Sequence, residues 1–285
     1  MKRLITPGFV LATLWSTATL IWAGPIEIEN TRIERTTEES LIAFVDFGAG
    51  TFELHSNAND LLIDAEIRYD RKYVDVFVDY NNRRNQGRLE MSSELDSGRM
   101  KRNLTNDWDL GLASDIPVEL DIDIGAAKLR LDLTDIQITR LKLEIGAVDA
   151  EVWWDQPNSV SLDEIIIDCG ASSLVMEGLG DANFRSLRFD GGVGGFELDF
   201  SGRWDQSATA DFDIGLGSLE LAIPEHIGVR IETDDSFLSS IDVDREFREV
   251  DDDVYESDNY KTAEITFDIT IQIGMGSVEV RSIRR

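Results

Sequence analysis

The sequence predicts an all-β fold: a right-handed parallel β-helix, a solenoid of coils of about 22 residues, with an N-terminal sheet-like cap. Two observations predict this fold. A motif that ends in a corner glycine recurs along the C-terminal two thirds of the chain, and apolar residues alternate with polar ones on both sides of each copy. A fixed repeat of this length indicates a solenoid, in which each coil buries its apolar face against its neighbours. The repeated glycines are Gly125, Gly146, Gly170, Gly192, Gly215 and Gly274.

The coils are predicted to begin at Pro117 and to fill a solenoid domain over residues 119–285. In the first coil, Leu120, Ile122 and Ile124 alternate with polar residues before the glycine, and the same alternation follows it. Period-two alternation places these apolar side chains on one face of a strand. We expect the glycine to permit a positive φ at a corner between two sheets. A right-handed coil is expected because parallel crossovers are nearly always right-handed.

Residues 25–118 lack the repeat and are expected to form a separate β cap domain. Residues 45–54 contain two short alternating runs about a glycine turn, a pattern typical of either a hairpin or a coil corner. Residues 61–67 and 73–80 alternate as two further strands. A cap is expected because the bare end of a solenoid is an exposed sheet edge.

The N-terminal segment over residues 1–23 has the pattern of a signal peptide. Lys2 and Arg3 precede a mostly apolar run, and the small pair Ala23-Gly24 follows it. An uncleaved membrane anchor is the alternative, since about 19 apolar residues just suffice to cross a bilayer. Hydroxyl side chains within the run favour cleavage. We therefore expect an exported protein that is periplasmic or associated with the cell envelope.

The composition excludes one class of partner. The net charge of −29 comes from 56 acidic and 27 basic residues. Such a surface repels phosphate backbones, so we expect no nucleic-acid binding. It attracts cations and basic partners, although solubility is the simpler explanation of the charge. The single cysteine, Cys169, allows no intramolecular disulfide and is expected to be a buried, inert thiol.

An acidic segment over residues 232–260 interrupts the repeat and is expected to be irregular. It contains twelve acidic and two basic residues. Carboxylate oxygens are the ligands that calcium prefers, so the segment is a candidate calcium site. Neither an EF-hand loop nor a calcium-binding nonapeptide repeat is present, and a solvated acidic loop is the alternative. The candidate ligands are Asp251, Asp252 and Asp253, and the second choices are Asp242 and Asp244.

No catalytic residue is assigned from the sequence. His55 and His226, the only histidines, lack partners at the spacing of a zinc site, and no nucleophile motif is present. Stacked coils are expected to align outward acids in a ladder with steps of about 4.8 Å. Paired carboxylates of this kind cleave glycosidic bonds in other proteins, but these turns are too tight to build a cleft. The predicted ladder contains Asp123, Glu144, Asp168, Asp190 and Asp213.

Three segments share motifs with a known group of proteins. They are residues 108–120, residues 223–231 with their Ile-Pro-Glu-His start, and residues 255–280. Together with the glycine corners, they make the chain similar to bacterial envelope proteins with a toast-rack β-solenoid. This group is related to cell-wall-active antibiotic response proteins and to candidate adhesins. The resemblance implies a protein outside the cytoplasm that is linked to envelope stress or adhesion. The chain differs from the response proteins, which carry several N-terminal membrane helices.

The sequence thus predicts a non-catalytic exported protein that acts as a scaffold, as an adhesin-like module or as an envelope-stress-related binding module. The expected partner is an envelope protein or a cell-surface component, and calcium is the one candidate cofactor. The alternative is a carbohydrate-active β-helix enzyme that uses outward carboxylates. A further candidate contact is the pair Trp153-Trp154, because alternation turns one ring outward, where it can stack on a sugar or a peptide. Packing under a loop is the other interpretation.

Overall fold

The computed structural model describes residues 26–57, 61–95, 104–235 and 239–284, which form seventeen β-strands and no helix. The all-β prediction is confirmed, and the predicted signal peptide lies outside the described residues. Accordingly, no helix within these ranges is long and apolar enough to cross a membrane. The strands are β1 (Ile26–Glu34), β2 (Ser40–Ser56), β3 (Leu61–Asp70), β4 (Val74–Arg83), β5 (Gln86–Leu95), β6 (Asn106–Leu112), β7 (Pro117–Asp132), β8 (Gln137–Ile145), β9 (Asp149–Trp153), β10 (Leu162–Glu177), β11 (Phe184–Asp199), β12 (Ala208–Pro224), β13 (Gly228–Asp235), β14 (Ser239–Val243), β15 (Phe247–Asp251), β16 (Val254–Ser257) and β17 (Thr266–Ile283).

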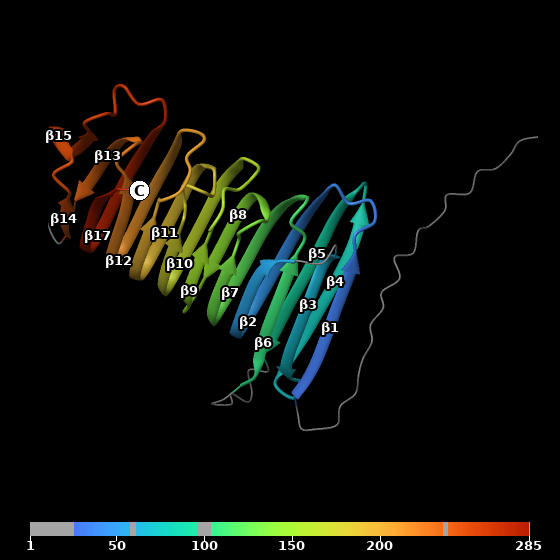
Figure 1. Ribbon diagram of the computed structural model, residues 1–285. Coiled ribbons are helices and arrows are strands. Elements are labelled where there is room, and N and C mark those ends of the chain that lie inside the picture. The colour runs from blue at the N-terminus through green and yellow to red at the C-terminus, as the bar shows by residue number, and fades with distance from the viewer. Residues whose placement is uncertain (1–25, 58–60, 96–103, 236–238, 285) are drawn as a thin grey trace, which may run out of the picture.

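The long strands fold over at their glycines, so that one strand contributes to two layers (Figure 1). We call the layer formed before the glycine the first sheet and the layer formed after it the second sheet. Successive coils pair in parallel in both layers, in the order β7, β10, β11, β12 and β17. Between β7 and β10, one coil is formed by two shorter strands, β8 in the first sheet and β9 in the second. The pairing leaves the hand of the coil open, so the right-handed β-helix stays a prediction. The first sheet has the order β4-β5-β2-β7-β8-β10-β11-β12-β17-β13-β16-β15, and the second has the order β1-β3-β6-β2-β7-β9-β10-β11-β12-β17-β14.

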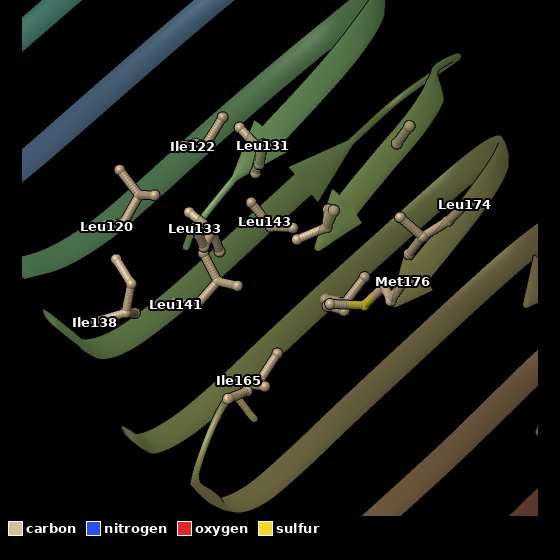
Figure 2. Close-up of a cluster of buried hydrophobic side chains, with 14 of the residues drawn as sticks. Leu120, Ile122, Leu131, Leu133, Ile138, Leu141, Leu143, Ile165, Leu174 and Met176 are labelled. Atoms are coloured by element: carbon tan, nitrogen blue, oxygen red, sulfur yellow. The ribbon is translucent and has the colours of Figure 1, made fainter. Parts of the chain in front are cut away.

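The core lies between the two sheets and repeats from coil to coil. Leu120, Leu141 and Ile165 occupy matching positions of β7, β8 and β10, and each is almost fully buried. Figure 2 shows these side chains beside Leu131 and Met176 of the opposite layer. Because the strands alternate, every second residue enters this core and its neighbours face solvent. The same alternation therefore makes the outer faces rows of polar side chains.

The corner glycines are needed for a reason that differs from the predicted one. None of the six repeated glycines has a positive φ. A Cβ built on Gly146 would instead lie 2.4 Å from the carbonyl oxygen of Gly125, and one on Gly192 would lie 2.4 Å from that of Gly170. The glycines thus allow the backbones of successive coils to touch at the corner. Positive φ occurs two residues later, as at Gly217 (φ 151).

The stack of coils begins earlier than predicted, at β2. Residues 41–54 of β2 pair in parallel with residues 118–131 of β7 on both sides of the corner. The glycine turn within residues 45–54 is therefore a coil corner, not a hairpin. The remaining N-terminal strands cover this coil: β5 and β6 pair with β2, and β4, β3 and β1 continue the two sheets outward.

The acidic segment over residues 232–260 is more regular than predicted. β13 and β14 pair in parallel with β17 and form a further partial coil. β15 and β16 form an antiparallel hairpin, and β16 pairs with β13. The segment therefore covers the C-terminal end of the stack, as Figure 1 shows at its red end.

Candidate functional site

The outer face of the first sheet carries a continuous row of carboxylates. Parallel pairing in register places equal positions of successive coils side by side, about 4.8 Å apart. The predicted ladder is present in this register, and Asp46 of β2 extends it by one coil. We call the row the acidic row; its members are Asp46, Asp123, Glu144, Asp168, Asp190 and Asp213.

Like charges in the acidic row disfavour ionisation. The pKa of Asp123 is raised above its usual value by partial burial and then by the charges of Asp46 and Glu144. Lys142 opposes this effect, because its Nζ lies 2.6 Å from Glu144 and 3.8 Å from Asp121. Within the described residues, Lys142 and Arg188 are the basic side chains two residues from a member of the row on the same face, so the row holds more negative charge than they balance and attracts a cationic group.

At its N-terminal end the acidic row meets an exposed aromatic side chain. Across the strands, Asp46 lies opposite Ser92 of β5, which lies opposite Phe77 of β4. The Phe77 side chain is 57% exposed, which is high for an apolar residue. The Arg88 guanidinium stacks over the ring of Phe44 at 4.1 Å. A shallow hollow of about 380 Å³ lies between these groups, and its lining includes Phe44, Phe77, Arg88, Asp46, Asp123 and Glu144.

The alternation of β4 explains why Phe77 faces outward. Val76 and Val78 pack against the core, so Phe77 between them points to the opposite face. Its neighbours on that face are Asp75 and Asp79, which are both exposed. The strand over residues 73–80 was predicted, but the sequence alone does not show that this ring is uncovered, because cover depends on other strands.

A second hollow, of about 360 Å³, lies at the far ends of the coils of the second sheet. It is lined by acids, by Trp154 and by the exposed His226. Two of its carboxylates already bind backbone: Asp181 accepts a hydrogen bond from the Arg203 N–H at 2.8 Å, and Asp199 accepts one from the Ser201 N–H at 2.7 Å. These acids therefore hold turns in place.

Trp154, Trp204 and the cysteine are buried, as expected for packing residues and for an inert thiol. Trp154 is 2% exposed and Trp204 is 8% exposed, while Trp153 is half-buried. Cys169 is buried, and burial followed by the charges of Asp168 and Asp190 raises its pKa to about 12. A thiol with this pKa is not a nucleophile near neutral pH.

The two histidines are far from forming a catalytic set. His55 Nε2 lies 2.8 Å from Asp109 on the second sheet, and its Nδ1 lies 2.8 Å from the Ser56 carbonyl oxygen. Burial lowers the pKa of His55, but these two partners outweigh it and raise the pKa above its usual value. His55 and Asp109 are both exposed. Among the described residues, the hydrogen-bond partners of the His55 ring are Asp109 and the Ser56 carbonyl oxygen, and neither is a hydroxyl nucleophile.

The predicted calcium ligands do not converge on one point. Asp251 ends β15, and Asp252 and Asp253 form the turn into β16, with all three exposed. Asp244 is already engaged, since its Oδ2 accepts a hydrogen bond from the Ser282 N–H at 2.8 Å. Across the ranges that the structure describes, no group of three or more His, Cys, Asp or Glu side chains is placed to hold a metal ion. A calcium site at Asp251, Asp252 and Asp253 stays a prediction.

That prediction is tested by thermal melting. If calcium bridges these carboxylates, calcium at about the millimolar level of extracellular sites raises the melting temperature above that in sodium of equal ionic strength. The matched variant replaces Asp251, Asp252 and Asp253 with Asn, and it loses the calcium-specific rise. Equal melting curves for the wild type in both salts would contradict calcium binding and would leave solubility as the explanation of the acidic residues.

Neutralising one carboxylate of the acidic row is expected to stabilise the protein slightly. Asp123→Asn removes like-charge repulsion and raises the free energy of unfolding by about 0.5 kcal/mol at low salt. The gain shrinks in high salt because the charges are screened. Since the pKa of Asp123 is raised by folding, wild type loses stability relative to the variant as pH rises through the carboxyl range. Urea melts check this, with the exposed Asp163→Asn outside the row as control.

Comparison with known proteins gives a family match over most of the chain. Residues 23–164 and 157–222 match a family model described as the N-terminal domain of toast_rack, DUF2154. No curated protein matches the chain.

Three solved structures align with the chain over most of its length. A candidate cell adhesion protein from Clostridium sporogenes ATCC 15579 is 18% identical with a TM-score of 0.50, over 90% of this chain and 100% of that one. A candidate adhesin from Bacteroides fragilis NCTC 9343 is 9% identical with a TM-score of 0.37, over 90% and 98% of the two chains. A candidate adhesin from Parabacteroides distasonis ATCC 8503 is 10% identical with a TM-score of 0.34, over 90% and 97%. At 18% identity, the likeness to the Clostridium sporogenes protein lies in the fold alone.

Proposed function

Since the chain belongs to the family of the toast-rack N-terminal domain, we propose that it is an exported, non-catalytic protein of the cell envelope. It binds another envelope or cell-surface component through the outer face of its first sheet and acts as a scaffold or an adhesin-like module. In this proposal the coils of the solenoid are right-handed, and residues 1–23 are a signal peptide that is cleaved on export. The Clostridium sporogenes protein of the same fold, a candidate cell adhesion protein, is consistent with this role.

The observation that carries the proposal is the hollow beside the acidic row. Its lining combines Phe77, which is 57% exposed, with the ring of Phe44, so apolar area that a partner can cover is available there. This area lies next to unbalanced carboxylates on a sheet that continues through successive coils. Exposed apolar area at the centre with charge around it is the usual make-up of a binding surface.

A carbohydrate-active enzyme is the second candidate, and one observation favours it. The raised pKa of Asp123 is what a general acid needs, and Asp46 and Glu144 lie next to it as possible second carboxylates. Against it, the three acids lie in one line on an open sheet, whereas catalysis needs groups on both sides of a bound sugar. We therefore prefer binding to hydrolysis.

Fractionation of cells that produce the full chain with a C-terminal tag tests the export and envelope steps. The tagged protein is expected outside the cytoplasm and in contact with the envelope, and wild type is compared with a variant in which Asp46, Asp123 and Glu144 are Asn. Salt-sensitive retention that the variant loses supports binding through this face. A cytoplasmic location would contradict the proposal, and release of reducing ends from a polysaccharide panel would support the enzyme instead.

A further inference from the structure

β4 is the outermost strand of the first sheet at the capped end of the molecule. Among the described strands it pairs with β5 alone, through antiparallel partners from Val74 to Arg83. Its other edge thus presents backbone N–H and C=O groups that no described strand pairs. Such an edge is a template for another extended chain. In Figure 1, β4 lies at the blue-green end of the stack, away from the coil-to-coil contacts.

The outer face of this edge carries an aromatic residue between acids. Asp75, Phe77 and Asp79 face outward on β4. On the neighbouring strand, Glu94 lies opposite Asp75 and Glu90 lies opposite Asp79. Like charges directly opposite each other destabilise a sheet, and Asp75 with Glu94 forms such a pair on one side of Phe77. On the other side, Glu90 already pairs with Arg88 at 2.6 Å, which leaves Asp79 as the acid at the edge. A strand that brought cations to these positions would relieve that repulsion.

From this placement we propose that the β4 edge binds an extended basic segment of a partner protein by strand addition. The added strand hydrogen-bonds to the free edge of β4, sets Lys or Arg beside Asp75 and Asp79, and lays an apolar residue on Phe77. This inference names the partner class for the proposed binding role and rests on it. Strand addition supplies affinity through the main chain and specificity through alternate side chains.

Other occupants fit the edge less well. A second copy of this chain paired to β4 in an antiparallel register centred on Phe77 would set Asp75 opposite the Asp79 of the other copy, which opposes pairing. An anionic lipid surface is repelled by a protein of net charge −29. A basic strand is the occupant whose charge complements the edge.

The test uses the full chain and a labelled peptide probe of the sequence Thr-Lys-Thr-Val-Thr-Lys-Thr with blocked ends, read by fluorescence anisotropy. Successive N–H groups of a strand point to opposite edges. N-methylation at the odd positions and N-methylation at the even positions therefore give two probes of equal charge. Strand addition to one edge predicts that one of the two methylated probes loses binding and the other keeps it. Equal binding of both methylated probes would overturn the proposal, since the attraction would then be electrostatic only.

Variants of the protein test the named side chains. Asp75→Asn with Asp79→Asn is expected to weaken binding about fivefold, which corresponds to two cross-strand charge pairs of about 0.5 kcal/mol each. The matched control, Asp149→Asn with Glu151→Gln, removes two outward acids with the same spacing from β9 of the second sheet and leaves the affinity within about twofold. Equal losses in both double variants would overturn the assignment to β4.

The aromatic contact has its own control. Phe77→Ser is expected to weaken binding about threefold, whereas Val250→Ser, at a residue that is 50% exposed on β15, leaves it unchanged. Thermal melts confirm that each variant is folded, and the methylated probes need no variant. Sedimentation of the chain without the probe is expected to show no dimer that depends on β4. A dimer that Phe77→Ser dissociates would assign the edge to a second copy of the chain. Probe binding without envelope retention would refute the proposed function and leave this inference standing; retention without probe binding would do the reverse.

Discussion

Gly146→Val is expected to lower the free energy of unfolding by about 3 kcal/mol. The first atom of the new side chain would lie 2.4 Å from the carbonyl oxygen of Gly125, and backbone on the neighbouring coil cannot move aside as a flexible side chain can. The Gly146 N–H also bonds to the Ile124 carbonyl oxygen at 2.8 Å, so separating the coils weakens that bond too. Overpacking of this kind costs about 1–3 kcal/mol or somewhat more.

The measurement is urea unfolding followed by circular dichroism. Ala147→Val is the matched control, since it places the same Val side chain one residue later at an exposed position of the same corner. That control is expected to change the free energy of unfolding by less than about 0.5 kcal/mol. If Gly146→Val were as stable as Ala147→Val, the close approach of the coils at this corner would be wrong.

The second large effect is expected at Glu38, a buried carboxylate between β1 and β2. Its side chain is 3% exposed and accepts hydrogen bonds from the Tyr80 hydroxyl at 2.6 Å, the Asn82 amide at 2.7 Å and the Thr36 N–H at 2.6 Å. Glu38→Ala leaves these donors without their acceptor and lowers the free energy of unfolding by about 3 kcal/mol. Glu39→Ala, next to it and exposed, is the control and is expected to be near neutral.

Glu38 also predicts how stability depends on pH. Burial raises its pKa, but the hydrogen bonds from Tyr80, Thr36 and Asn82 outweigh burial and lower the pKa to about 2. A carboxyl whose pKa is lowered by folding stabilises the protein above its unfolded pKa of about 4.3, and this contribution is lost as pH falls from there to about 2. Glu38→Gln is expected to flatten this part of the curve of unfolding free energy against pH. An unchanged slope in Glu38→Gln would show that other carboxyls cause the acid loss.

Much of the fold was predictable from the sequence because the repeat is local. The positions of Gly125 and Gly146 and the alternation around them predict the register, and the register places Asp123 beside Glu144. The reason for the glycines was not predictable, since a close approach between coils depends on atoms far apart in the sequence. At β2 the sequence left a hairpin and a coil corner open, because four strands intervene before β7 and no repeat of about 22 residues connects the two.

The candidate site was predictable only in part, for the same reason. The acidic row follows from the repeat, but the hollow needs β4 and β5, whose place beside β2 is a matter of long-range pairing. The predicted calcium ligands Asp251, Asp252 and Asp253 are adjacent in sequence and lie exposed around the turn at Asp253 (φ 60). Whether they bind an ion stays a prediction, because the sequence places the acids but not the ion.

The position of β17 has a consequence for the order in which the protein is made. β17 follows β13 and β14 in the sequence but lies between them and β12 in both sheets. During synthesis, β12 and β13 therefore each lack their pairing with β17 until residues 266–283 have been made. A nascent chain that stalls before residue 266 presents two open strand edges, which are the surfaces that aggregate and that chaperones must shield. Pairing of β17 with β12 on one side and with β13 and β14 on the other then covers these open edges.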